Sequence, residues 1–284
     1  MKVLILGAGG MLGNAVIRVM CENQHLEVFG TIRSNNVPKI FSTEIAKKII
    51  TGFDVTYRDS LVKLFADIKP DVVINCVGLV KQLAEVDDPL IALPINAILP
   101  HQLANLCRLT EARLVHISTD CVFSGTKGNY KETDTPDATD LYGKSKYIGE
   151  LNDTHTITLR VSIIGHELQS AHGLIDWFLA QQGSCKGFNQ AVFSGLPTTV
   201  LAAIIRDIVL PKPELSGVYH VAAKPISKYD LLSLVAKVYG KAINIIPDDQ
   251  LIIDRSLNAD RFKSATGYEA PSWEELIRTM HAYQ

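Results

Sequence analysis

The stretch MKVLILGAGGMLG, residues 1–13, decides the fold of this chain. An apolar run, Val3–Leu6, stops at Gly7, and an amphipathic pattern begins at Met11. Closely spaced glycines let a turn between strand and helix bend tightly, and let the backbone approach a pyrophosphate that the helix N-terminus attracts. Glycine turns join many strands to helices, so the flanking strand and helix give the pattern its weight. It predicts a dinucleotide site of the Rossmann type.

The first half of the chain alternates short apolar, β-branched runs with longer amphipathic stretches. This alternation is typical of a parallel sheet covered by helices on both faces. The predicted strands are Val3–Leu6, Glu27–Thr31, Val72–Asn75, Arg113–Ser118 and Thr156–Val161. The predicted helices are Met11–Glu22, Tyr57–Asp67, Asn96–Leu109 and Thr139–Leu151.

The strict alternation weakens after Val161. We expect helices at 201–209, 229–239 and 273–281, strands at 217–221 and 242–246, and loops at 165–171, 183–189 and 210–213. The predicted fold is therefore α/β: a doubly wound parallel sheet of the Rossmann type in residues 1–161, and a smaller mixed α/β substrate lobe in residues 162–284. The chain is expected to cross between the two lobes.

Composition limits the class of protein. The chain has 284 residues, a formal net charge of −2 and no basic run, which gives little support to a nucleic-acid or polybasic membrane partner. Five cysteines without CxxC spacing suit reduced thiols in a cytoplasmic protein. The first apolar run is too short for a signal peptide, and we expect no apolar run to be long enough to span a bilayer.

The end of the second predicted strand bears on the choice of cofactor. It reads GTIRS, residues 30–34, without the acid that usually accepts a hydrogen bond from the ribose 2′-hydroxyl of NAD. Arg33 could instead pair with the 2′-phosphate of NADP. The alternative is that Arg33 is a solvated loop residue without a role in binding. Asp54 follows another short apolar run and is a candidate acceptor for the adenine amine, although aspartate is also common at turns.

The segment YGKSK, residues 142–146, supplies the reactive groups. Tyr142 and Lys146 are four residues apart and share one helix face, so the ammonium is expected to lower the pKa of the phenol. Such a phenol exchanges a proton with a carbonyl group, and the hydroxyl of Thr119 can hold the same oxygen. A Tyr-Lys pair alone is weak evidence, because many helices carry one on a solvent face. The prediction of hydride transfer rests on three features in order along the chain: the glycine turn, the strand that ends in Ser-Thr-Asp, and the Tyr-Lys pair.

In these segments the chain resembles the extended short-chain dehydrogenases/reductases, and most of all their dTDP-4-dehydrorhamnose reductase branch. The matching stretches are GAGGMLG at 7–13, NCVG at 75–78, STDCVFSG at 118–125 and YGKSK at 142–146. The resemblance implies Tyr142 as general acid, Lys146 on the nicotinamide ribose and the tyrosine, and Thr119 on the substrate oxygen. It also implies that Asp120 positions the sugar or the threonine.

The expected cofactor contacts follow from the same resemblance and from the strand ends. They are Gly7, Gly10, Met11, Leu12, Gly13, Thr31, Arg33, Asp54, Val55, Asn75, Cys76, Val77, Gly78 and Lys146. Asn96 lies where the family has a supporting asparagine. No metal site is expected, because the chain does not clearly match the glutamates that some members use for a metal between subunits.

The predicted function is reduction of a nucleotide-linked 4-keto-6-deoxysugar with NADPH, with NADH still usable. A nucleotide-sugar 4-epimerase stays open, because it needs little beyond Tyr142 and Lys146. A dehydratase ranks lower. Such enzymes have the sequence Thr-Asp-Glu at this point, and here Cys121 stands at the third position, in place of the glutamate. A non-catalytic regulatory subunit that keeps the fold, like the beta subunit of methionine adenosyltransferase, is a further alternative. A homodimer is compatible with the resemblance.

Overall fold

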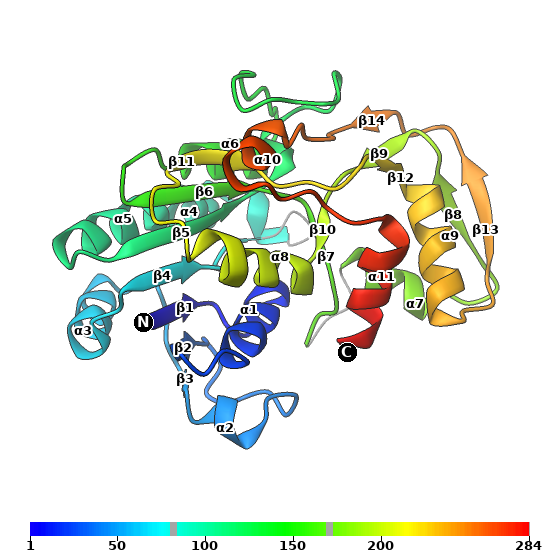
Figure 1. Cartoon of the computed structure of the whole chain (residues 1–284). Helices are drawn as coiled ribbons and strands as arrows, with labels where there is room; N and C mark the ends of the chain where they lie inside the picture. Colours follow the sequence, from blue (N-terminus) through cyan, green and yellow to red (C-terminus); the bar gives the residue numbers. More distant parts are fainter. Residues whose placement is uncertain (80–83, 169–172, 284) are drawn as a thin grey trace.

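A seven-stranded parallel sheet forms the centre of the protein (Figure 1), in a computed structural model that describes residues 1–79, 84–168 and 173–283. The strand order is β11-β6-β5-β4-β1-β2-β3. The bounds are β1 Lys2–Leu6, β2 Glu27–Thr31, β3 Ile49–Ile50, β4 Val72–Asn75, β5 Arg113–Ser118, β6 Thr156–Arg160 and β11 Gly217–His220. The order reverses between β1 and β4, and ligands of open α/β sheets bind beyond the carboxyl ends of strands at such a point.

Helices cover both faces of this sheet, as the continuous burial of β4 requires. On one face α1 (Met11–Cys21) and α8 (Thr198–Ile204) lie side by side. The other face carries α3 (Arg58–Ile68) and α5 (Leu99–Leu109). The predicted doubly wound α/β class is confirmed. Shorter helical segments are α2 Thr43–Ala46, η1 Ala84–Asp87, α4 Pro89–Ala92, η2 Leu93–Ile98, η3 Asp120–Val122, η4 Ile205–Val209 and α10 Asp260–Thr266.

The first helix lies unusually close to the turn that precedes it. A Cβ atom placed on Gly13 would lie 2.0 Å from the carbonyl oxygen of Gly7, so only glycine fits at this contact. Gly7 itself has a φ of 83°, a left-handed conformation that side chains disfavour. The two glycines therefore set the distance between β1 and α1, and with it the position of the helix N-terminus.

The second half of the chain builds small sheets and helices beside the main sheet (Figure 1). Parallel strands β8 (Ser184–Phe188) and β13 (Asn244–Asp248) form one of them. Three strands form another, in the order β12-β9-β14, and two form a third, β10-β7. The bounds are β7 Ile163–Ile164, β9 Ala191–Phe193, β10 Leu196–Pro197, β12 Ile226–Ser227, β14 Ile253–Asp254, α6 Leu141–Ile148, α7 Leu174–Ala180, α9 Lys228–Tyr239 and α11 Trp273–Ala282.

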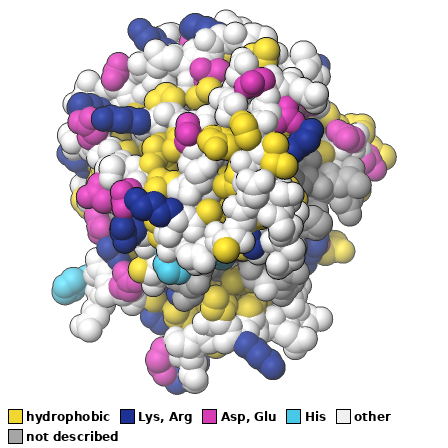
Figure 2. All heavy atoms as spheres, turned by 90° about the vertical axis from the view of Figure 1, so that its right-hand side faces the viewer, with side chains coloured by type: hydrophobic (Ala, Val, Ile, Leu, Met, Phe, Trp, Pro, Cys, Tyr) yellow, Lys and Arg dark blue, Asp and Glu magenta, His cyan; other side chains and the backbone are white. Residues whose placement is uncertain are grey.

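The chain returns once to the main sheet after residue 161, because β11 pairs with β6. The boundary at residue 161 stays a prediction. Figure 2 shows the outer face of the lobe on the right of Figure 1, where apolar side chains gather in the centre among scattered charges. Exposed apolar residues of this lobe include Trp177, Ile246 and Ile252.

The predicted loop at 183–189 is wrong, because residues 184–188 form β8. In this strand Cys185 and Gly187 face inward and alternate with exposed Ser184 and Lys186. Its glycine and serine are typical of loops, and parallel pairing with β13 overrides that preference. Residues 169–171 of the predicted loop at 165–171 lie outside the described part of the chain.

One helical run is long and apolar enough to cross a membrane by length and composition, contrary to the expectation from consecutive apolar residues. It spans Pro89–Leu109, and 44% of its most apolar window is buried inside the protein. Its inward residues, among them Leu99 and Leu103, pack against the sheet face that β4 and β5 share with α3. The run is therefore built as a core helix.

We expect Gly13→Ala to destabilise the protein by about 1–3 kcal/mol, because the added methyl group forces α1 away from the turn. Gly10→Ala is the matched control, since its Cβ would lie 3.5 Å from Gly7 O, an ordinary contact. Urea unfolding of both variants measures the difference. Equal stability of the two variants would show that the close contact does not hold the helix.

Candidate active site

The glycine turn has the geometry that a pyrophosphate needs. Gly10 caps α1 without a side-chain hydrogen bond, and the first turn of α1 contains no acidic residue. The positive end of the helix dipole is therefore not neutralised by the protein's own side chains. Leu12 is buried in the core and Met11 is half-buried at the turn. These residues fit a dinucleotide pyrophosphate.

The end of β2 supports this turn from the side. Thr31 is buried, and its hydroxyl accepts a hydrogen bond from the backbone N–H of Gly7 at 3.4 Å. Arg33 is exposed and makes no hydrogen bond or ion pair with any described residue. Asp54 accepts hydrogen bonds from the backbone and hydroxyl of Thr56, at 2.8 and 2.7 Å, so one of its oxygens is occupied locally. Val55 beside it is buried.

The loop after β4 forms the next wall. The amide of buried Asn75 accepts from the N–H of Val77 at 3.1 Å and contacts His116 at 3.2 Å. Cys76 follows, and burial raises the pKa of its thiol to about 12. This thiol is therefore protonated and unreactive at neutral pH. Gly78 is exposed and completes the predicted segment.

A buried asparagine joins this loop to α6, the helix of Tyr142 and Lys146. Asn96 accepts from the N–H of Leu79 at 2.9 Å and donates to Ser145 Oγ at 3.2 Å. It lies in the π-helical segment η2, and π-helical turns occur often at functional sites. The sequence indicated Asn96 through the family resemblance but did not indicate Ser145, which stands inside the YGKSK motif.

Helix α6, which carries Tyr142 and Lys146, is pressed against the end of β5. Asp140 caps it by accepting from the N–H of Gly143 at 2.7 Å. A Cβ on Gly143 would lie 2.2 Å from the carbonyl oxygen of Cys121, so glycine is required here too. This contact brings Tyr142 and Lys146 to the carboxyl edge of the sheet.

Lys146 is almost fully buried. Its Nζ donates to the carbonyl oxygen of Ile117 at 2.7 Å, and a Cβ on Gly78 would lie 3.7 Å from the same nitrogen. Burial lowers the pKa of Lys146 to about 8, and the charge of Glu150 acts in the opposite direction. The lysine therefore joins the end of β5 to the loop after β4.

Tyr142, Thr119 and Asp120 lie together at the end of β5. Thr119 Oγ1 donates to Asp120 at 3.1 Å and accepts from the N–H of Cys121 at 3.1 Å. Burial raises the pKa of Tyr142 well above its usual value, and Cys121 adds to this, while a hydrogen bond with Thr119 opposes it. Burial also raises the pKa of Asp120, against the charge of Arg255.

The expected lowering of the Tyr142 pKa by Lys146 is not observed in this structure. Burial of the phenol dominates, and the ammonium is directed to the Ile117 carbonyl. The spacing of four residues placed the two groups on one helix, but it carried no information about how deeply either is buried.

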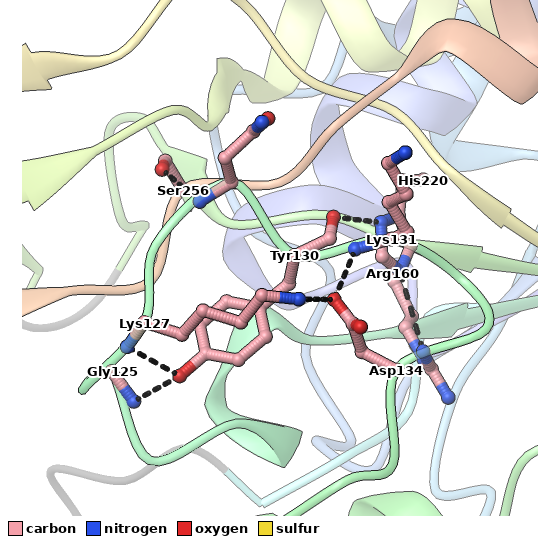
Figure 3. A network of polar contacts seen from close by, with 9 residues as sticks. Gly125, Lys127, Tyr130, Lys131, Asp134, Arg160, His220 and Ser256 are labelled. Carbon is pink, nitrogen blue, oxygen red and sulfur yellow. Dashed lines mark hydrogen bonds and ion pairs between the residues drawn. The ribbon is translucent and has the colours of Figure 1, made fainter.

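The loop that follows the catalytic strand is fixed by a polar network around Tyr130 (Figure 3). The phenol oxygen accepts from the N–H groups of Gly125 and Lys127, both at 3.1 Å. The carbonyl oxygen of Tyr130 contacts His220 Nδ1 at 3.0 Å. Its N–H donates to the carbonyl of Ser256 at 2.8 Å. The network therefore ties this loop to β11 and to the segment after β14.

Sequence reasoning missed several charged and polar groups at the site. Arg255 contacts Cys121 Sγ at 3.8 Å, and Ser162 is a hydrogen-bond partner of Asp120. Lys228 lies within electrostatic range of both Asp120 and Cys121. These three residues come from the second half of the chain and belong to no short motif, so the sequence offered no signal for them.

A separate cavity of about 570 Å³ lies beside the C-terminal end of α6. Glu150 and Arg160 line it, together with Tyr147 and Arg261. None of the predicted cofactor or catalytic residues named from the sequence lines this cavity. We therefore place the site by its chemistry, at the edge formed by β1, β4 and β5.

Fold and site together define the class: an oxidoreductase with the Rossmann domain and Tyr-Lys helix of the extended short-chain dehydrogenases/reductases. The chain belongs to the family described as RmlD substrate binding domain, which matches residues 1–282. The predicted resemblance is confirmed.

Relatives in this family differ in their functions. The dTDP-4-dehydrorhamnose reductase of Aggregatibacter actinomycetemcomitans is 25% identical over 99% of both chains. The methionine adenosyltransferase 2 subunit beta of Xenopus tropicalis is 27% identical over 84% of this chain and 72% of its own.

Solved structures share the fold. A dTDP-4-dehydrorhamnose reductase from Bacillus anthracis, determined in complex with NADP, has a TM-score of 0.80 at 21% identity and covers 100% of this chain and 99% of its own. A UDP-glucose 4-epimerase from Thermus thermophilus, with NAD, has a TM-score of 0.78 at 19% identity, covering 100% and 98%.

We expect the buried charge of Lys146 to make stability depend on pH. Its folded pKa of about 8 lies below the ordinary value of 10.5, so between these values the unfolded state binds more protons and stability rises with pH. From pH 7 to pH 10, the free energy of unfolding of wild type should rise by at most about 3 kcal/mol relative to that of Lys146→Met, as measured by urea unfolding. Lys144→Met, at an exposed position of the same helix, should follow wild type. Parallel profiles of wild type and Lys146→Met would contradict the assigned burial cost.

Proposed function

We propose that this protein reduces the 4-keto group of a nucleotide-linked 6-deoxysugar with NADPH, and that Tyr142 is the general acid. The convergence of the glycine turn, the loop after β4 and the Tyr-Lys helix at one edge of the sheet carries this proposal. The hydride would come from the bound cofactor. The protein's own groups hold the reactants and supply the proton.

Each residue's proposed role follows from its position. The N-terminus of α1 holds the pyrophosphate, and Lys146, beside Gly78, holds the nicotinamide ribose. Tyr142 keeps its proton at neutral pH because burial raises its pKa, and it donates that proton to the carbonyl oxygen of the substrate. Thr119 donates a second hydrogen bond to this oxygen after releasing Asp120, which until then fixes the hydroxyl.

The relatives support the reductase, and the residues of the site argue against a dehydratase and a regulatory subunit. A dTDP-4-dehydrorhamnose reductase aligns with the whole chain, and the structure of another was determined with NADP. Dehydration would need a carboxylate where Cys121 stands. A regulatory role draws on the methionine adenosyltransferase beta subunits alone, and retention of Thr119, Tyr142 and Lys146 together favours turnover.

We expect Tyr142→Phe to lower the turnover number by about 10²–10⁴-fold, because the proton donor is lost while the ring is kept. The assay is NADPH oxidation with dTDP-, UDP- and GDP-linked 4-keto-6-deoxysugars. Cofactor affinity should stay within about twofold in a direct titration, since the phenol oxygen is the only group removed. Undiminished turnover in the variant would refute the role of Tyr142. If wild type oxidises no NADPH with any 4-keto sugar yet binds a partner enzyme tightly, the regulatory function is correct.

We expect NADPH to bind better than NADH, because Arg33 offers a positive charge beside the ribose and no acid repels a 2′-phosphate. The arginine is exposed, so we expect its contribution to be on the order of 1 kcal/mol, about fivefold in affinity. Calorimetric titration of wild type and Arg33→Ala with both cofactors measures this. Loss of NADPH affinity with NADH unchanged supports the assignment. Equal losses, or none, would show that Arg33 does not read the phosphate.

A further inference from the structure

A row of buried polar side chains crosses one face of the main sheet. Asn75 of β4, His116 of β5 and Thr158 of β6 are partners in register, so their side chains project from the same face. All three residues are buried. On the same face Leu114, two residues before His116, packs in the apolar cluster that includes residues of α5. Buried polar groups need hydrogen-bonding partners, so the contacts of this row show what each side chain holds in place.

The hydrogen bonds of Asn75 determine the tautomer of His116. The N–H of Val77 can only donate, so the atom of Asn75 that it meets at 3.1 Å is the amide oxygen. The amide nitrogen of Asn75 then faces His116 Nδ1 at 3.2 Å, and it too can only donate. Nδ1 is therefore the acceptor, and the ring carries its proton on Nε2. Burial lowers the pKa of His116 well below its ordinary value, with the charges of Lys146 and His101 adding to this, so the ring is neutral.

The second ring nitrogen of His116 gains nothing at this position. Nε2 is buried and has no hydrogen-bond partner among the residues that the structure describes. An unpaired buried N–H costs free energy, and an apolar side chain would avoid that cost. What the histidine adds here is therefore the acceptor at Nδ1.

The bond between His116 and Asn75 sets the shape of the loop after β4. The amide oxygen of Asn75 accepts from the N–H two residues further on, which is the hydrogen bond of an Asx turn. This turn packs directly on the glycine turn, because a Cβ on Gly7 would lie 3.0 Å from Val77 Cγ2 and 3.3 Å from Val77 N. If the amide turned over, its nitrogen would face the N–H of Val77, and two donors would meet. The orientation of one amide therefore sets the distance between two loops that border the dinucleotide site.

The far end of the same loop is anchored separately. The N–H of Leu79 donates to Asn96 Oδ1 at 2.9 Å. Gly78 lies between the two anchors and beside Lys146, since a Cβ on this glycine would lie 3.7 Å from Nζ. Only the first anchor depends on His116, so a change at the histidine should release one end of the loop and leave the other end in place.

We propose that His116 is a positioning residue for the dinucleotide: as an acceptor at Nδ1 it holds the Asn75 amide in the orientation that places Val77 against Gly7. His116 is fully buried in the sheet and acts through Asn75. This inference rests on the proposed function only in taking NADPH as the ligand of the glycine turn. Without the acceptor the amide nitrogen of Asn75 is unpaired, and the loop shifts to find it another partner. Binding of the dinucleotide then has to restore the loop, so affinity falls.

Calorimetric titration of the full-length chain with NADPH tests this role. We expect His116→Phe, which keeps a ring and removes the acceptor, to weaken NADPH binding by about five- to thirtyfold, the range that an unpaired buried donor produces. His116→Asn should recover most of the affinity, because its side-chain oxygen can take the place of Nδ1, although it fills the space less well. Thr156→Val is the matched control. Thr156 is equally buried on the same face, and its hydroxyl donates to Asp153 at the amino end of β6, so this variant should lose thermal stability and keep its NADPH affinity.

Two further measurements show whether the effect passes through Asn75. In an Asn75→Ala background, His116→Phe should weaken NADPH binding by less than about twofold, because no amide remains to be oriented. A long-range ¹H–¹⁵N NMR spectrum of wild type, with the signal assigned by its loss in His116→Asn, should show the ring proton on Nε2.

The outcomes separate this role from the proposed function. If wild type does not bind NADPH, the proposed function is wrong and the positioning role fails with it. If wild type binds NADPH and His116→Phe binds it equally well, the positioning role is refuted while the reductase function stands. The role is also refuted if the NADPH affinities of the variants follow their thermal stabilities, if the losses at Asn75 and His116 simply add, or if the ring proton lies on Nδ1.

Discussion

The buried ion pair between Glu150 and Arg160 holds the site to the sheet. Arg160 donates to the carboxylate through Nε at 2.7 Å and Nη2 at 2.6 Å, and both side chains are about 95% buried. Ser118, at the end of β5, donates to the same carboxylate at 2.7 Å. One carboxylate, two residues beyond α6, therefore joins the end of this helix to β5 and β6. Breaking such a buried pair by removing one partner typically costs about 3–5 kcal/mol.

The same arginine connects the pair to the substrate side. Its Nη1 contacts His220 Nε2 at 3.3 Å, and burial lowers the pKa of His220 to about 3, with the charge of Arg160 adding to this. A neutral imidazole accepts from Arg160 at one nitrogen and donates to the Tyr130 carbonyl at the other. Tyr130 in turn holds Gly125, on which Arg255 packs. Contacts therefore run without a break from the end of α6 to Arg255, and all of them except the last are polar.

The sequence predicted the Rossmann half well because its signals are local. A strand, a glycine turn and the start of a helix follow one another within the first thirteen residues, and the close contact at Gly13 is itself part of that motif. The second half depends on pairing between distant segments. Strands of two residues, such as Ile226–Ser227 and Ile253–Asp254, have no pattern of their own and exist because β9 lies between them. The positions of Lys228 and Arg255 depend on these strands, so no sequence motif predicts them.

Burial also explains why the electrostatics of the site differed from the sequence-based expectation. A lysine four residues from a tyrosine stabilises the phenolate when both are in water. Here burial raises the pKa of the Tyr142 phenol and lowers that of the Lys146 ammonium, so each shift favours the neutral form. A neutral phenol suits donation of a proton, which reduction requires. The close packing of Gly143 on Cys121, which presses α6 against the end of β5, thus also sets the environment in which the phenol keeps its proton.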